Sequence, residues 1–174
     1  MMNRIIRRMP VLVLVVVVGG LAAISASVNA LTASDDDFVI KATMAGMKEV
    51  ELARLAVKRG QSQTVIAFAR RMIADHTKAG NELRALARAR SIKLPAAPDT
   101  ESKAAVDQLS HLSPAEFDHN YMAMAVADHE AAVADFQSET ESGVDATFRD
   151  FATRTLPTLQ DHLRMARDTA LQLK

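Results

Sequence analysis

The sequence contains no cysteine and no tryptophan, and its aromatic content of 4% includes a single tyrosine. The lack of cysteine excludes disulfide bonds and thiolate chemistry. The few aromatic residues, together with abundant alanine, leucine, methionine and charged residues, disfavour a β-sheet and favour helices. Because the chain has 174 residues, we expect one domain whose stability comes from packing alone.

The first thirty residues have the three parts of a secretory signal peptide. Arginines at positions 4, 7 and 8 precede an apolar stretch over residues 11–24, which is shorter than the roughly 20 residues of a membrane span. Small residues then offer a cleavage site after Ala30. We expect residues 1–30 to be removed and residues 31–174 to form one domain in the periplasm or outside the cell. An uncleaved anchor that keeps the chain at a membrane is the alternative.

The charge of residues 31–174 and the motifs that the chain lacks exclude several functions. Without the three N-terminal arginines, 18 basic residues face 21 acidic ones, a net charge of −3, so nucleic acid is not expected as a partner. The sequence has no nucleophile elbow, no phosphate-binding loop and no His-Glu-x-x-His motif. An enzyme is therefore not indicated, and only a metal-dependent oxidation or hydrolysis stays open.

Four long segments carry apolar residues every three or four positions, which predicts four amphipathic helices. The expected helices cover residues 34–60, 62–93, 113–142 and 145–173. Ser34 followed by three aspartates predicts the start of the first helix, and Ser113 with Pro114 and Glu116 forms a capping box for the third. Pro157 lies inside the fourth and predicts a kink there.

The connections between these helices predict the topology. The first and last pairs are joined by short turns, whereas about 22 residues separate the second helix from the third, with a short extra helix expected over residues 100–109. A connection of that length crosses the whole bundle, so the second and third helices should run parallel. We therefore predict an all-α, ferritin-like four-helix bundle with one long crossover.

Aspartate precedes four of the five histidines, in the pairs 75–76, 118–119, 128–129 and 161–162. In each expected helix, the apolar residues spaced three and four positions apart form a stripe along one face. When each stripe is continued with the same spacing, it includes one ionisable residue. These four residues are Glu49, His76, His129 and His162. His111 and His119 fall on no such stripe. Counted from the helix ends, the four stripe residues lie within about one helical turn of a common level.

This layer predicts a metal site or a buried polar network. An ionisable side chain in a core costs several kcal/mol unless it is paired. Three imidazoles and one carboxylate form a ligand set that suits zinc or copper and can serve iron. Methionines elsewhere in the helices are most simply core residues, although in an exported protein they also leave copper(I) binding open.

The aspartates of the three stripe pairs have two predicted roles. Neighbouring residues on a helix point about 100° apart, so none of these aspartates faces its own histidine. They are expected either to accept an imidazole N–H from another helix, behind the metal ligands, or to pair with surface arginine or lysine. The aspartates in question are Asp75, Asp128 and Asp161.

Several segments resemble the bacterial exported family catalogued as domain of unknown function 4142. They are KEVELARLA (48–56), FARRMIADHTKAGNEL (68–83), FDHNYMAMAVADHEAAVADF (117–136) and ATRTLPTLQDHLRMA (152–166). The resemblance implies a ferritin-like fold and an exported or outer-membrane protein, and it implies no settled activity. The Glu-x-x-His spacing of di-iron proteins occurs only at Glu116–His119, in a first helical turn, so iron storage or di-iron oxidation is not expected.

Two functions from different classes follow. The first is an exported helical protein that binds a transition metal at the four stripe residues. The second is a non-catalytic structural, interaction or stress protein of the cell envelope, in which the Asp-His pairs form an interhelical polar network. A pH-sensing role for the clustered histidines is a further alternative.

Overall fold

The computed structural model describes residues 21–173, with side chains described from residue 35 onward, and within this range it consists of five helices and no strand. The helices are α1 (Leu21–Arg59), α2 (Gln63–Ala89), α3 (Thr100–Ser110), α4 (Pro114–Ser142) and α5 (Ala146–Gln172). The prediction of an all-α protein is therefore confirmed. The predicted capping box at Ser113 is present, and α5 continues past Pro157.

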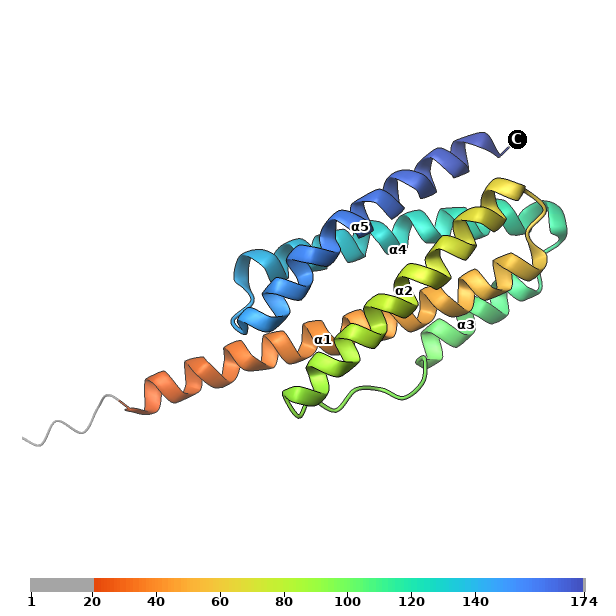
Figure 1. Cartoon of the computed structure of the whole chain (residues 1–174). Helices are drawn as coiled ribbons and strands as arrows, with labels where there is room; N and C mark the ends of the chain where they lie inside the picture. The colour runs from red at the N-terminus through yellow and green to blue at the C-terminus, as the bar shows by residue number, and fades with distance from the viewer. Residues whose placement is uncertain (1–20, 174) are drawn as a thin grey trace, which may run out of the picture.

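The four long helices pack together, and the short helix α3 lies in the connection between α2 and α4 (Figure 1). Helices α1 and α2 form one antiparallel hairpin and α4 and α5 form another. The hairpins face each other, with α1 beside α4 and α2 beside α5. As predicted, the long crossover makes α2 and α4 run in the same direction, which brings the middle of both helices to the same level.

The predicted start of the first helix at Ser34 is wrong, because α1 begins at Leu21 and continues through this serine. Asp35 is 2% exposed, and its carboxylate accepts backbone N–H groups of Val144 and Asp145 at the start of α5. It therefore caps a distant helix. Most of the predicted signal peptide, residues 1–20, lies outside the described residues, and cleavage after Ala30 stays a prediction. No helix among the described residues is long and apolar enough to span a membrane.

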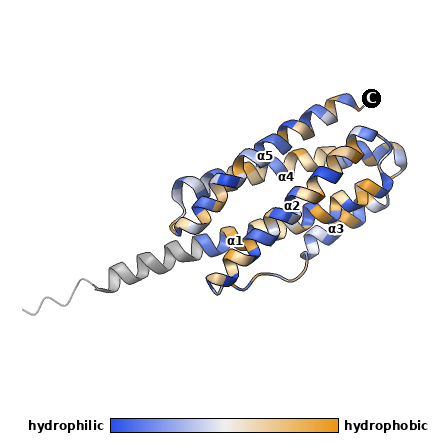
Figure 2. Cartoon of the chain, viewed as in Figure 1, coloured by the Kyte–Doolittle hydropathy of each residue, from blue (hydrophilic) through white to orange (hydrophobic). Residues whose placement is uncertain are grey.

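The core consists of two apolar clusters separated along the bundle. One lies toward the α1–α2 turn and includes Phe68, Phe117 and Tyr121. The other lies toward the α4–α5 turn and includes Phe148 and Phe151. Figure 2 shows the alternation of hydrophobic and hydrophilic residues along the long helices that produces these clusters. The predicted stripe residues lie between them, so a polar layer interrupts an otherwise apolar interior.

One of the four Asp-His pairs has a structural explanation. The Ser62 side chain makes no capping bond to α2. Asp118 of α4 accepts the backbone N–H of Gln61 at 3.1 Å and that of Ser62 at 2.7 Å. The carboxylate, which is 6% exposed, thus caps α2 from another helix, while the neighbouring His119 is exposed. This contact joins the two hairpins.

Replacement of Asp118 by alanine is expected to lower the free energy of unfolding by about 2 kcal/mol, because two partly buried backbone N–H groups at the start of α2 lose their acceptor. For a domain of this size the midpoint of thermal unfolding should fall by roughly 4–8 °C, measurable by circular dichroism. Asp37→Ala, which removes an exposed carboxylate from α1, is the matched control. Equal midpoints for the two variants would contradict the capping role.

Candidate metal centre

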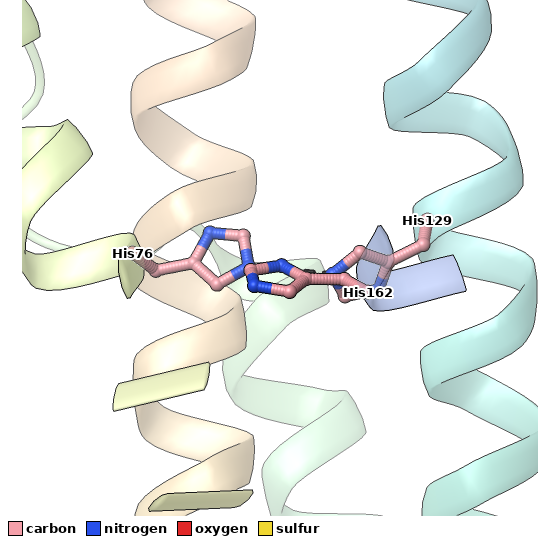
Figure 3. Close-up of side chains that lie close together, drawn as sticks. All are labelled: His76, His129 and His162. Carbon is pink, nitrogen blue, oxygen red and sulfur yellow. Dashed lines mark hydrogen bonds between the residues drawn. The ribbon is translucent and has the colours of Figure 1, made fainter. Parts of the chain in front are cut away.

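Three helices each contribute one histidine to the centre of the polar layer. His76 comes from α2, His129 from α4 and His162 from α5, and their rings converge between the helices (Figure 3). Each pair of ring centroids is 5.4 Å apart. One ring nitrogen of each residue lies within 4.8 Å of the other two. His129 and His162 are each 1% exposed and His76 is partly buried, so the group is shielded from bulk water.

The facing nitrogens of His76 and His129 are spaced like two ligands of one ion. Their Nε2 atoms are 3.3 Å apart. Two nitrogens bound to a tetrahedral ion at 2.0–2.1 Å are separated by about 3.3–3.4 Å. His129 Nδ1 lies 2.8 Å from the Ala125 carbonyl oxygen, to which it donates as an N–H. In the neutral imidazole this leaves the lone pair on Nε2, directed toward His76.

His162 is oriented by an aspartate of the neighbouring helix. Its Nε2 donates to Asp75 Oδ2 at 2.9 Å, and Arg71 also donates to this carboxylate. Burial raises the pKa of Asp75, but the hydrogen bonds from Arg71 and His162 outweigh it and hold the pKa below its ordinary value. His162 Nδ1 is buried without a hydrogen-bond partner among the described residues. An oriented imidazole with a free lone pair is thus available.

Burial keeps the three histidines neutral. Desolvation, with a smaller contribution from neighbouring imidazoles, lowers the pKa of His76 to about 3 and that of His129 to about 4. Desolvation also lowers the pKa of His162, against the opposing effect of Asp75. Neutral imidazoles are the form that binds a metal ion. The site therefore presents its nitrogens unprotonated well below neutral pH.

Glu49 lies in the same layer but on another side of His129. It is 4% exposed, and neither carboxylate oxygen has a hydrogen-bond partner among the described residues. Its Oε1 is 3.9 Å from His129 Nδ1, the nitrogen that already donates to Ala125. Burial, with a contribution from Asp128, raises the pKa of Glu49 to about 8. The structure therefore brings three of the four predicted ligands together, and the role of Glu49 stays a prediction.

The other predicted residues lie at the edge of the layer. Asp128 pairs with Lys48 of α1, whose Nζ is 2.8 Å from the carboxylate, and Asp161 pairs with Arg164 on its own helix. Of the three aspartates, Asp75 is the one that hydrogen-bonds a layer histidine. His111 is exposed and bonds to the carbonyl of residue 107.

Sequence reasoning missed Tyr121. Its hydroxyl is buried without a hydrogen-bond partner among the described residues, and burial together with Glu49 raises its pKa. The residue lies two helical turns before His129, and positions 121, 125 and 129 share one face of α4. The sole tyrosine of the chain on that stripe is a signal that could have identified it.

Comparisons with known proteins agree with this fold. No curated protein matches the chain. The crystal structure of a DUF305 fragment from Deinococcus radiodurans is similar, with a TM-score of 0.72 and 17% sequence identity over 80% of this chain and 97% of that one. At this identity the likeness shows a shared fold alone. The model of the family described as "Domain of unknown function (DUF4142)" matches residues 21–169, and the chain therefore belongs to this family.

Proposed function

We propose that this protein is an exported helical protein that binds one transition-metal ion through His76, His129 and His162. The observation that carries the proposal is the convergence of three ring nitrogens, from two buried histidines and one partly buried one, within 4.8 Å of one another. Three neutral nitrogens suit zinc and copper and can serve iron. Export is proposed from the basic, apolar and small-residue pattern of residues 1–30.

His162 Nδ1 has no hydrogen-bond partner among the described residues, and this favours a metal over a closed hydrogen-bond network. A buried polar atom without a partner costs about 1–3 kcal/mol, and folded proteins rarely leave one. His162 Nδ1 is such an atom. A bound ion would accept its lone pair together with that of His129, whose tautomer the Ala125 carbonyl already selects.

Glu49 is proposed as the fourth ligand. The geometry gives neither of its oxygens a hydrogen-bond donor among the described residues, and Asp128 is the one nearby group that a protonated Glu49 could bond to. Binding the same ion as the histidines would require its carboxylate to turn from the Nδ1 side of His129 toward the Nε2 side. A metal ion close to the carboxyl would also favour its ionised form, against the burial that raises its pKa.

An envelope structural, interaction or stress protein with an interhelical polar network is the second candidate. It is favoured by polar contacts that join different helices within the layer. These contacts link Lys48 with Asp128, His76 with His129, and Asp75 with His162. In that case the histidines would fix helix register and no ion would be involved.

Thermal unfolding with and without metal separates the two candidates. We expect zinc, copper or iron at a hundred times its dissociation constant to add about 2.7 kcal/mol to the stability of chelator-treated protein, or roughly 5–10 °C in the midpoint. His162→Ala should lose this shift, whereas His119→Ala, which changes an exposed histidine, should keep it. A midpoint that does not respond to chelator or to any of the ions would favour the polar network.

Replacement of Asp75 by asparagine is expected to weaken metal binding about 10- to 100-fold, because the carboxylate orients His162 and increases its basicity. The affinity is measured by competition with a chelator of known dissociation constant. Asp161→Asn is the matched control, since Asp161 also precedes a layer histidine but pairs with Arg164. Equal losses in the two variants would argue against a specific role for Asp75.

A further inference from the structure

A cavity of about 180 Å³, partly open to solvent, adjoins the three histidines, between the α1–α2 hairpin and the α4–α5 hairpin. The histidines form one end of it, together with Glu49 and Asp75. The remaining wall is largely apolar and includes Phe38, Leu83, Phe136, Phe151 and Leu159. Protein interiors are close-packed and contain few voids larger than a water molecule. A void of this size beside a polar group needs an explanation.

Small residues on facing helices create the space. Ala42 and Gly46 line it from α1, Ala79 and Gly80 from α2, and Ala132 from α4. A Cβ atom added at Gly46 would meet nothing within 4 Å, so close helix packing does not require this glycine. Glycine inside a helix is less favourable than alanine. The sequence therefore leaves room here where a larger side chain would fit.

We propose that this cavity binds a small, neutral, largely apolar molecule, about the size of one aromatic ring, with a polar atom directed toward the histidines. An apolar protein cavity of about 150 Å³ is large enough for benzene. The neutral imidazole nitrogens at one end offer hydrogen-bond partners for a single polar group. The two lysines of the lining, Lys41 and Lys48, are already paired with Asp135 and Asp128, so a charged molecule would lose its hydration without gaining a free counter-ion.

The seam between α1 and α4 offers a way in. Two ion pairs bridge it, Lys41 with Asp135 and Lys48 with Asp128, each with a contact of 2.8 Å. The two lysines are seven residues apart, as are the two aspartates, so the pairs lie two helical turns apart. Between them the wall consists of small, exposed residues, including Ala45. Uncharged molecules can pass such an opening after a modest separation of the two helices.

The test uses chelator-treated full chain, expressed with its own N-terminal segment and without a tag, titrated with benzene, phenol and benzoate by NMR. Because the protein is metal-free, the outcome is independent of the proposed metal binding. We expect saturable binding of benzene, binding of phenol about three- to tenfold tighter through one hydrogen bond, and no binding of benzoate. The perturbed resonances should belong to residues that line the cavity.

Two variants that fill the space make the test specific. Gly46→Leu and Ala132→Leu each place a larger side chain on a cavity-lining position, and both should weaken benzene and phenol binding at least tenfold. Leucine is a good helix former, so both variants should fold, and circular dichroism checks this. Ala67→Leu, at an exposed position of α2, is the control and should bind as the wild type does.

Three results would overturn the inference. One is the absence of saturable binding of either neutral ring at millimolar concentration. Another is binding that is unchanged in both filled variants, which would locate the ligand elsewhere. The third is benzoate binding as tight as phenol binding, which would contradict a neutral site.

Discussion

Replacement of His129 by alanine is expected to lower the affinity for the bound metal by about a hundredfold or more. Structural zinc sites with four protein ligands bind with about 10–16 kcal/mol, or about 2.5–4 kcal/mol for each ligand. His129 is central to the layer, because its Nε2 faces His76 and its Nδ1 is fixed by the Ala125 carbonyl. Removal of this ring deletes one ligand and leaves the facing His76 ring free to rotate.

The measurement is a chelator competition on folded wild-type and variant protein. Because alanine leaves a cavity at a position that is 1% exposed, His129→Gln is tested in parallel as a larger polar replacement. His119→Ala also removes a histidine that follows an aspartate, and it should retain full affinity because its side chain is exposed. An affinity that survives in both His129 variants would exclude this residue as a ligand.

Metal should stay bound at a pH where ordinary histidine sites release it. For three histidines with the usual pKa of 6.5, a change from pH 7 to pH 5 weakens binding by roughly ten thousandfold, because protons compete for every nitrogen. Burial has lowered the pKa of His76 to about 3 and that of His129 to about 4. Protons therefore compete little for these two nitrogens at pH 5. Burial also lowers the pKa of His162, so its contribution should stay below the roughly 25-fold loss of one ordinary histidine, and we expect a total loss of less than about 25-fold.

Equilibrium dialysis at pH 7, 6 and 5, followed by measurement of the retained metal, tests this pH dependence. A hexahistidine peptide, whose rings are exposed, is the reference and should lose its metal over the same interval. Loss of the protein's metal between pH 7 and 6 would mean that the three rings titrate like exposed histidines. Such a result would contradict the burial of the layer in solution.

Periodicity in the sequence predicted much of the site, because an amphipathic stripe fixes which side chains enter the core. Glu49, His129 and His162 are buried as the stripes predicted. The long crossover also predicted that α2 and α4 run parallel, which explains why His76 and His129 meet at one level. Both inferences depend on helix geometry alone, and this geometry varies little between proteins.

Features that depend on a distant partner were not predictable in this way. Asp35 was assigned to the start of its own helix, but it binds backbone groups of Val144 and Asp145, more than 100 residues later. The position of the Glu49 carboxylate depends on its rotamer, which the stripe does not determine. The cavity was missed because alanine and glycine on a stripe occur both where helices pack closely and where they leave space.

Metal content is the most direct test of the central claim, that the three histidines bind an ion. The full chain is expressed with its own N-terminal segment, purified without a tag or chelator and analysed by mass spectrometry. We predict about one equivalent of zinc, copper or iron in the wild type, and none in His129→Ala. A wild-type protein that contains no metal and takes up none of the three ions on titration would contradict the claim and leave the histidines as a structural polar layer.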